Sequence, residues 1–285
     1  MNTNVYVATL PRSGSTLLGM MINQHSECFN MGESFFWGKF IPRQIKCSCG
    51  SIDCVILNKI FARVSMVPDI MNFSLTCQTL DELPEKHANI HLSNALKEDI
   101  ESSCNGLDIL SGYFREIIGQ KIIIDTSTNI RIAEYLLSRP NWKIILLLRN
   151  PYGILHSCKK ADIRYQIQKP LSRKVHVFVD FAEIALGMML SKNVLVIKYE
   201  DLCDKPKDAI SQICSFLQIP IEENMLNFKN DLGHTVMGNS MRFDDVTVIK
   251  KDIDWVTKLS TVEKDLIRSD IGLVQLYRHF GYELT

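Results

Sequence analysis

Glycine, arginine and hydroxyl residues stand together early in the chain, in a combination that can hold a phosphate group. Residues 11–16 read PRSGST and lie between two apolar segments, a strand-like one at 5–9 and a helix-like one at 17–22. The first N–H groups of a helix have no intrahelical partner, and the helix dipole favours negative charge beside them. Gly14 lets the backbone approach an anion closely, and Arg12 adds a guanidinium that stays charged. The segment therefore predicts a phosphate-binding loop.

Two other interpretations of this loop are open at this point. A Walker A loop ends in Gly-Lys followed by Ser or Thr, and that run occurs nowhere in the chain, so a P-loop kinase is the weaker alternative. The loop could also be an ordinary strand-to-helix connection in which a serine caps the helix. Ser13, Ser15 and Thr16 nevertheless offer hydroxyl donors to an anion.

A second set of polar residues follows the segment KIILLL at 143–148, which has the aliphatic composition of a buried parallel strand. Arg149 comes directly after it, and Ser157 lies about two turns into the next helix. Ligands of open parallel sheets bind at the carboxyl ends of the strands, where Arg149 would lie. We therefore expect this pair to bind a second phosphate. A surface arginine and a helix-face serine are the alternative.

An acidic residue and an aromatic stretch follow the region expected to form the second strand. Glu33 would lie at the carboxyl end of that strand, among the ligand-binding residues. Residues 34–40, SFFWGKF, would lie beside the same site or pack in the core. Polar residues at 125–127 likewise follow a strand-like segment. A parallel sheet would bring all these groups to one edge.

Three of the nine cysteines, Cys47, Cys49 and Cys54, lie within eight residues. They could bind zinc with a fourth ligand from elsewhere, a histidine or Cys77. The segment lacks the second Cys or His pair of a well-defined zinc motif, so structural thiols are the preferred interpretation and no metal site is assigned. We find no export signal at the N-terminus and expect the cysteines to be reduced rather than disulfide-bonded.

The elements that would position these residues alternate between strand and helix. Strand-like segments at 5–9, 121–125, 143–148 and 193–198 are each followed by a helix-like segment. This alternation predicts right-handed crossovers and an α/β fold, a doubly wound parallel sheet flanked by helices.

One long stretch, at about 52–118, interrupts this alternation and is predicted to be a helical insertion whose last helix is short, at 111–118. A polar, basic stretch at 160–174 is expected to precede the next apolar helix, at 175–190. We expect the insertion and the basic stretch to wall the ligand pocket. The whole chain, residues 1–285, is predicted to be a single domain.

The composition excludes several broad classes of protein. Of 285 residues, 46% are hydrophobic and 22% are charged, which is typical of a globular chain. Lys plus Arg equals Asp plus Glu at 32 each, so no basic nucleic-acid surface is implied. The longest aliphatic run, at 144–148, is far shorter than the ~20 residues of a membrane span. We therefore expect a cytoplasmic protein without a nucleic-acid partner.

Four blocks of the chain resemble the sulfotransferases that use 3′-phosphoadenosine 5′-phosphosulfate (PAPS), above all the tyrosylprotein and bacterial types. They are PRSGSTLL at 11–18, LRNP at 148–151 continuing to Ser157, YEDL at 199–202 and HTVMGNSMRF at 234–243. The resemblance implies a P-loop-like fold and transfer of a sulfuryl group from PAPS to an acceptor hydroxyl or amine. The other product is adenosine 3′,5′-bisphosphate (PAP), and no metal is required.

The resemblance also implies which residues bind the nucleotide. The loop at 11–16 would hold the 5′-phosphosulfate, and Arg149 with Ser157 would hold the 3′-phosphate. A C-terminal segment at about 232–245 would cover the nucleotide, its glycine and arginine reaching the 3′-phosphate. The implied nucleotide-binding residues are Arg12, Ser13, Gly14, Ser15, Thr16, Arg149, Ser157, Gly238, Asn239 and Arg242.

Catalytic roles follow from the same resemblance. Glu33, after Gly32, occupies the place of the family's general base, although a surface or salt-bridged glutamate is the alternative. Arg12 and the backbone amides of the loop would stabilise the departing phosphate. The acceptor would be a small molecule or a carrier-bound group, which the sequence does not identify.

Two departures from the family pattern bear on activity. Thr126 stands where many relatives carry a lysine, so Arg12, Ser13 or Ser127 would have to stabilise the leaving group. Asn150 replaces the usual aspartate of Arg-Asp-Pro. A non-catalytic relative that retained the nucleotide pocket is therefore a further alternative.

Overall fold

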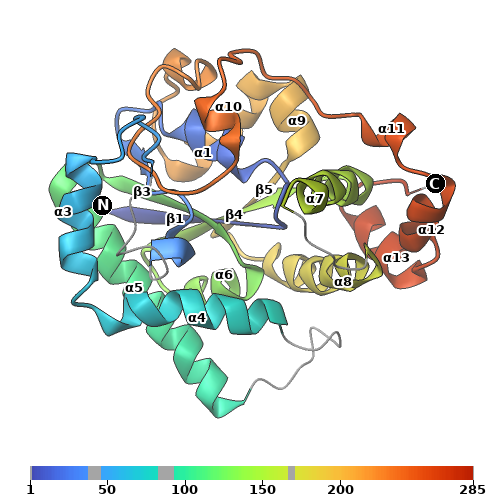
Figure 1. Ribbon diagram of the computed structural model, residues 1–285, viewed down its shortest axis with the longest axis horizontal. Helices are drawn as coiled ribbons and strands as arrows, with labels where there is room; N and C mark the ends of the chain where they lie inside the picture. The colour runs from blue at the N-terminus through green and yellow to red at the C-terminus, as the bar shows by residue number, and fades with distance from the viewer. Residues whose placement is uncertain (1, 38–45, 83–92, 166–170, 285) are drawn as a thin grey trace.

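One sheet of five parallel strands forms the centre of the molecule, in the order β2-β3-β1-β4-β5 (Figure 1). The structure, a computed structural model, describes residues 2–37, 46–82, 93–165 and 171–284. The strands are β1 (Thr3–Thr9), β2 (Cys28–Asn30), β3 (Ile122–Thr128), β4 (Trp142–Leu148) and β5 (Val194–Lys198). The predicted α/β fold with a doubly wound parallel sheet is confirmed, and the first strand lies at its centre.

Alternate residues of the central strand pack into two separate hydrophobic clusters, one on each face of the sheet. Tyr6 and Ala8 belong to one cluster, and Val5 and Val7 to the other, because successive side chains of a strand point to opposite faces. Figure 1 shows α1, α9 and α10 over one face and α5, α6 and α8 over the other. Burial on both faces explains why residues 144–148 of β4 are all aliphatic.

Most of the helices follow the alternation predicted from the sequence. The helices that follow β1, β3, β4 and β5 are α1 (Ser15–Ile22), α6 (Ile130–Leu136), α7 (Pro151–Tyr165), α8 (Leu171–Met188), α9 (Tyr199–Asp204) and α10 (Pro206–Leu217). The C-terminal helices are α11 (Trp255–Lys258), α12 (Thr261–Arg268) and α13 (Ile271–His279), and three short 3₁₀ helices are η1 (Ser34–Phe36), η2 (Glu223–Leu226) and η3 (Ser240–Phe243).

The stretch predicted as an insertion is helical in its described part, but its last helix is much longer than expected. It contains α3 (Val55–Val64), α4 (Pro68–Glu82) and α5 (Asn94–Ile118), so residues 111–118 are only the end of a 25-residue helix. Serines within α5 obscured its helical pattern in the sequence. The hydroxyls of Ser103 and Ser111 donate to carbonyls one turn earlier, which lets serine continue a buried helix.

The helices on either side of the basic stretch at 160–174 extend further into it than predicted from the sequence. In its described residues, α7 continues to Tyr165 and α8 already begins at Leu171. Lys159 is part of α7, and its ammonium pairs with the carboxylate of Glu263 on α12 at 2.5 Å. This ion pair joins α7 to α12.

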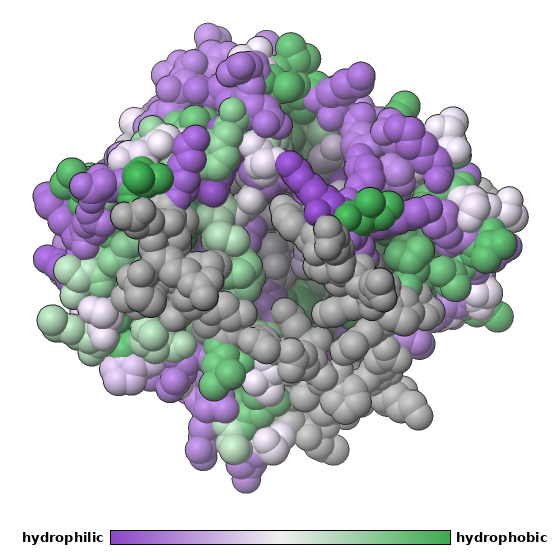
Figure 2. All heavy atoms as spheres, viewed as in Figure 1, coloured by the Kyte–Doolittle hydropathy of each residue, from purple (hydrophilic) through white to green (hydrophobic). Residues whose placement is uncertain are grey.

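The surface carries polar and apolar groups in mixture. On the face shown in Figure 2, hydrophilic residues gather over the half that contains α9 and α10, with hydrophobic residues dispersed among the others. Within the described residues, no helix is both long enough and apolar enough to cross a bilayer.

Candidate functional site

The loop between β1 and α1 has two residues in the left-handed region of backbone space. Arg12 has a φ of 73° and Gly14 a φ of 99°. A Cβ atom on Gly14 would lie 2.6 Å from Cδ2 of Tyr199, so only glycine fits there. The hydroxyl of Ser13 is buried and has no hydrogen-bond partner among the described residues. A tight turn with an unpaired donor at a helix N-terminus is suited to an anion.

Arg149 is fixed beside this loop by three contacts. Its Nη1 donates to the carbonyl oxygen of Arg12 at 2.6 Å, and its guanidinium lies 4.3 Å from the ring centroid of Tyr199. Nη2 is buried, makes no hydrogen bond to the described residues, and lies 3.5 Å from the carboxylate of Asp252. The side chain is thus rigid and keeps one edge of its guanidinium for a ligand.

Ser157 lies on α7 and faces the same loop. The Nε of Arg12 donates to its hydroxyl at 3.3 Å. Ser157 and Arg149 are both buried, with 8% and 5% of their surfaces exposed. The structure therefore brings Arg12, Arg149 and Ser157 together, as the strand-end argument predicted.

Asn150, the departure from Arg-Asp-Pro, has a structural role. Its Oδ1 accepts from the backbone N–H of Tyr152 at 3.0 Å, at the start of α7. Its own N–H donates to Glu200 at 3.0 Å. An asparagine caps a helix about as well as an aspartate, so the substitution leaves this turn intact.

Glu33 lies on the other side of the loop, after β2, and is half-buried. Burial raises the pKa of Glu33 to about 7; the cations Arg242 and Arg12 lower it, and the nearby Asp125 raises it further. A carboxyl with a pKa near neutrality is suited to accept a proton under physiological conditions.

A buried network holds the segment that carries Glu33. Asp125 accepts from the hydroxyl of Ser34 and, at 2.6 Å, from the N–H of Ser127. Ser127 Oγ in turn accepts from the N–H of Phe35 at 3.2 Å. Burial raises the pKa of Asp125 to about 6, against the hydrogen bonds from Ser127 and Ser34, which lower it. Asp125 and Ser127 are therefore committed to positioning η1 on β3.

The C-terminal segment expected to cover the nucleotide docks on β2 and α1. Val236 pairs with Gly32 in a parallel bridge. The N–H of Asn239 donates to the hydroxyl of Thr16 at 3.0 Å, and Gly238, with a φ of 94°, lies against the same threonine. Ser15, the first residue of α1, is buried.

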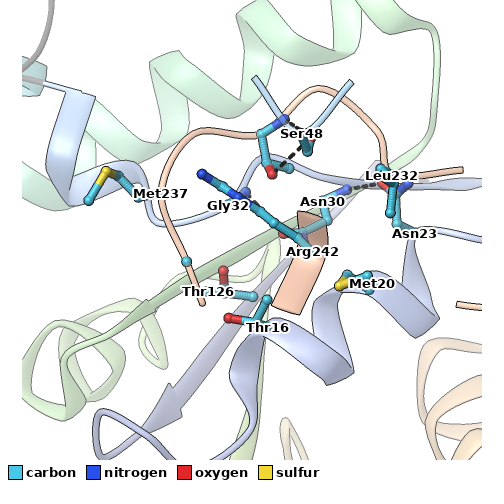
Figure 3. Close-up of a pocket in the computed structure, with 12 residues that line it drawn as sticks. Thr16, Met20, Asn23, Asn30, Gly32, Ser48, Thr126, Leu232, Met237 and Arg242 are labelled. Carbon is cyan, nitrogen blue, oxygen red and sulfur yellow. Dashed lines mark hydrogen bonds between the residues drawn. The ribbon is translucent and has the colours of Figure 1, made fainter. Parts of the chain in front are cut away.

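Arg242 lies across a small pocket next to Glu33, between Ser48 on one side and Thr16 and Thr126 on the other (Figure 3). It is 8% exposed, and its Nε and Nη1 form no hydrogen bond with any residue that the structure describes. The pocket is lined by Thr16, Met20, Asn23, Asn30, Gly32, Ser48, Thr126, Leu232, Thr235, Met237, Gly238 and Arg242.

The resemblance places Arg242 with Arg149 and Ser157 at the 3′-phosphate, and this role stays a prediction. Arg242 faces the ends of β2 and β3, whereas Arg149 follows β4, and β1 lies between them in the sheet. The predicted cations therefore flank the loop on two sides.

The aromatic stretch divides between core and site. Trp37 is fully buried and packs on Phe61 and Phe114, with ring centroids 4.6 and 5.4 Å away, so it belongs to the core. Phe35 and Phe36 are half-buried next to Glu33, with their ring centroids 3.9 Å apart. Residues 38–40 lie outside the described part of the chain.

Sequence reasoning missed three residues of the site. Tyr199 supports both Gly14 and Arg149, and Asp252 pairs with Arg149. His156 is buried beside Ser157 with neither ring nitrogen hydrogen-bonded. Tyr199 is the first residue of the block YEDL, and His156 directly precedes Ser157, so both lie in or next to segments that the sequence had already linked to the site. Asp252 lies in a segment without any motif.

Comparisons with known proteins agree with this architecture. Residues 4–223 match the model of the sulfotransferase family. Protein-tyrosine sulfotransferase A of Caenorhabditis elegans is 20% identical over 98% of this chain and 67% of its own length. The sulfotransferase domain of the curacin biosynthetic pathway has a TM-score of 0.57 at 19% identity, covering 100% of this chain and 99% of that domain.

A second solved structure, the sulfotransferase domain of the Synechococcus PCC 7002 olefin synthase, has a TM-score of 0.53 at 18% identity, covering 99% of this chain and 95% of that one. These two structures share the fold. The family model spans most of the sheet, the anion loop and the Arg149–Ser157 pair. The chain belongs to the sulfotransferase family.

Proposed function

We propose that this sulfotransferase uses PAPS as its donor and transfers the sulfuryl group to a hydroxyl or amine. The observation that carries the proposal is a set of buried donors, in and beside the loop, that make no hydrogen bond to the described residues. Within the part of the chain that the structure describes, hydrogen-bond partners are absent for Ser13 Oγ, Arg149 Nη2 and the Nε and Nη1 of Arg242. Leaving buried polar groups unpaired is costly, so an anionic ligand that satisfies them would bind strongly.

The donor set fits a nucleotide with two phosphate positions. Arg149 and Ser157 would hold the 3′-phosphate on the β4 side. The loop from Arg12 to Thr16 would hold the 5′-phosphosulfate. PAPS, when bound, supplies the sulfuryl group and a phosphate leaving group. Gly238 and Asn239 would act through Thr16, by fastening the C-terminal segment onto α1.

Glu33 and Arg242 would form the acceptor side of the site. Glu33 takes the proton of the acceptor as its oxygen or nitrogen bonds to sulfur and the bond from sulfur to the 5′-phosphate oxygen breaks. Arg12 and the loop amides hold the negative charge that develops on that phosphate oxygen. Arg242, on the Glu33 side of the loop, would orient the sulfuryl oxygens rather than the 3′-phosphate.

Ser13, rather than Ser127, would replace the missing lysine. The Ser13 hydroxyl is unpaired in the loop, whereas Ser127 is held by Ser34 and Phe35. Thr126 is buried and lines the Arg242 pocket. The leaving group therefore depends on Arg12 and Ser13.

The acceptor is proposed to enter beside Phe35 and Phe36. The curated relative is named a protein-tyrosine sulfotransferase, and a phenol suits the aromatic surroundings of Glu33. The helices α3, α4 and α5 would form part of the wall, because η1 packs against α4.

Nucleotide binding followed by transfer tests the proposal in two steps. PAP should bind and raise the melting temperature, whereas ATP with magnesium should not. Radiolabelled PAPS should then label an acceptor in a panel of tyrosine peptides, simple phenols, alcohols and amines. Stabilisation by ATP and magnesium alone would favour a kinase. PAP binding without transfer to any acceptor would indicate a non-catalytic relative.

A further inference from the structure

Three cysteines and a histidine converge at one point outside the nucleotide site. The ligand atoms of Cys47, Cys49, Cys54 and His234 all lie within 4.8 Å of one another. The Nδ1 of His234 is 3.2 Å from Sγ of Cys54 and 3.8 Å from Sγ of Cys47. We propose that these four residues bind a structural zinc ion.

The distances agree with tetrahedral zinc coordination. Zn–S bonds of about 2.3 Å and Zn–N bonds of about 2.0 Å place sulfur and nitrogen about 3.5 Å apart on the edge of a tetrahedron, and two sulfurs about 3.8 Å apart. The two sulfur–nitrogen distances, 3.2 and 3.8 Å, lie on either side of that value.

The ligand chemistry selects zinc over other common ions. Thiolates and imidazole suit zinc, whereas magnesium and calcium require oxygen ligands. Three cysteines and one histidine form a common closed set for structural zinc. A disulfide would use only two of the thiols and would give no role to the third sulfur or the imidazole.

The backbone around the cysteines forms a tight knuckle that aims the thiols at one point. The N–H of Cys47 donates to the carbonyl of Ser51 at 2.8 Å, and the N–H of Gly50 donates back to Cys47 at 2.9 Å. Gly50 has a φ of 88°, which a residue with a side chain rarely adopts. Cys54 is the residue before α3, so a rigid helix begins directly at the site.

The fourth ligand comes from a distant part of the chain, which gives the site a structural purpose. Ser48 Oγ donates to the carbonyl of Gly233 at 2.9 Å, and the N–H of Thr235 donates to Ser48 Oγ at 2.9 Å. These bonds place the imidazole over the cysteines. The zinc ion would therefore clamp the knuckle to the segment that carries Gly238, Asn239 and Arg242. With four protein ligands, it would have no open position for catalysis.

Metal analysis of the intact chain tests the site without any assay of sulfuryl transfer. Protein purified without chelators should contain about one zinc per chain, as measured by inductively coupled plasma mass spectrometry. Cobalt exchanged into the site should give the sulfur-to-metal charge-transfer band and the intense visible bands of tetrahedral thiolate coordination. Folded protein with less than about 0.2 zinc per chain, or a disulfide between any two of the three cysteines, would overturn the proposal.

Variants separate the ligands from the other thiols. Cys49→Ser, which changes the exposed ligand, and His234→Ala should each lower the zinc content about tenfold or more. His234→Cys should retain zinc, because four cysteines also form a zinc site. Cys203→Ser, a half-buried thiol on α9, should retain the full content. Equal zinc in wild type and both ligand variants would show that the metal is bound elsewhere.

Discussion

The Nε of Arg12 lies 3.3 Å from the hydroxyl of Ser157, across 145 residues of sequence. Arg12 belongs to the loop after β1 and Ser157 to the second turn of α7, so this contact joins the two proposed phosphate positions. Arg149 reinforces it by donating to the Arg12 carbonyl at 2.6 Å. A ligand held by Arg149 and Ser157 would therefore also fix the conformation of the anion loop.

Truncation of Arg149 to alanine should weaken PAP binding more than removal of the Ser157 hydroxyl. Arg149→Ala loses a charge-assisted hydrogen bond worth about 1.5–3 kcal/mol and the support of the Arg12 carbonyl, so we expect a tenfold to hundredfold higher Kd, or more. Ser157→Ala removes one neutral donor and should raise the Kd by about tenfold or less. Calorimetric titration with PAP measures both. Unchanged affinity in Arg149→Ala would place the 3′-phosphate elsewhere.

Replacing the proposed base should remove turnover and its pH dependence. Since the pKa of Glu33 is about 7, kcat/KM should rise with pH through that value as the carboxylate forms. Glu33→Gln should lower kcat by about 10²- to 10⁴-fold. PAP affinity should stay nearly constant, which serves as the control. A variant with wild-type kcat would exclude Glu33 from the mechanism.

The same substitution should change the pH dependence of stability. The pKa of Glu33 rises from its ordinary value near 4.5 to about 7 on folding, so ionisation destabilises the native state. This destabilisation is absent below pH 4.5, grows between pH 4.5 and 7, and is complete above pH 7. Glu33→Gln should therefore be more stable than wild type at pH 8 by about 1–3 kcal/mol, and equally stable at pH 4. Urea unfolding at both pH values measures the difference. A constant difference would contradict the shifted pKa.

Two glycine substitutions should have opposite effects on stability. Gly14→Ala places a Cβ atom 2.6 Å from Tyr199 at a positive φ, so we expect a loss of more than about 2 kcal/mol and of PAP binding. Gly112→Ala lies in α5 with open space around it and should stabilise by about 0.5–1 kcal/mol. Chemical denaturation compares them. Similar stabilities would show that the loop can relax around a side chain.

Substitution of two serines, Ser13 and Ser127, should distinguish a residue that acts in catalysis from one that stabilises the fold. Ser13→Ala removes an unpaired donor, and we expect kcat to fall by about 10²-fold with little change in unfolding free energy. Ser127→Ala leaves part of the Asp125 and Phe35 network unpaired and should cost about 1–3 kcal/mol of stability. Kinetics and denaturation of both variants provide the measurement. A reversed pattern would assign the leaving-group role to Ser127.

Much of the fold could be predicted from the sequence because its signals are local. Continuous aliphatic segments such as β4 indicate strands buried on both faces, and their alternation with helices fixes a parallel sheet. The anion loop was predicted from glycine and hydroxyl residues at a strand-to-helix junction. The length of α5 was not, because its buried serines have low helix propensity and are stabilised by bonds to the preceding turn.

The sequence by itself determined the residue types at the strand ends, and the parallel sheet then required that Arg12, Arg149 and Ser157 meet. Which residues from outside the sheet join these sites depends on the tertiary structure. Segments between helices carry no periodic signal, so their docking depends on long-range contacts. Ser48 holds residues 233–235 and thereby brings His234 to the cysteines. The same docking, rather than any local pattern, brings Arg242 close to Glu33.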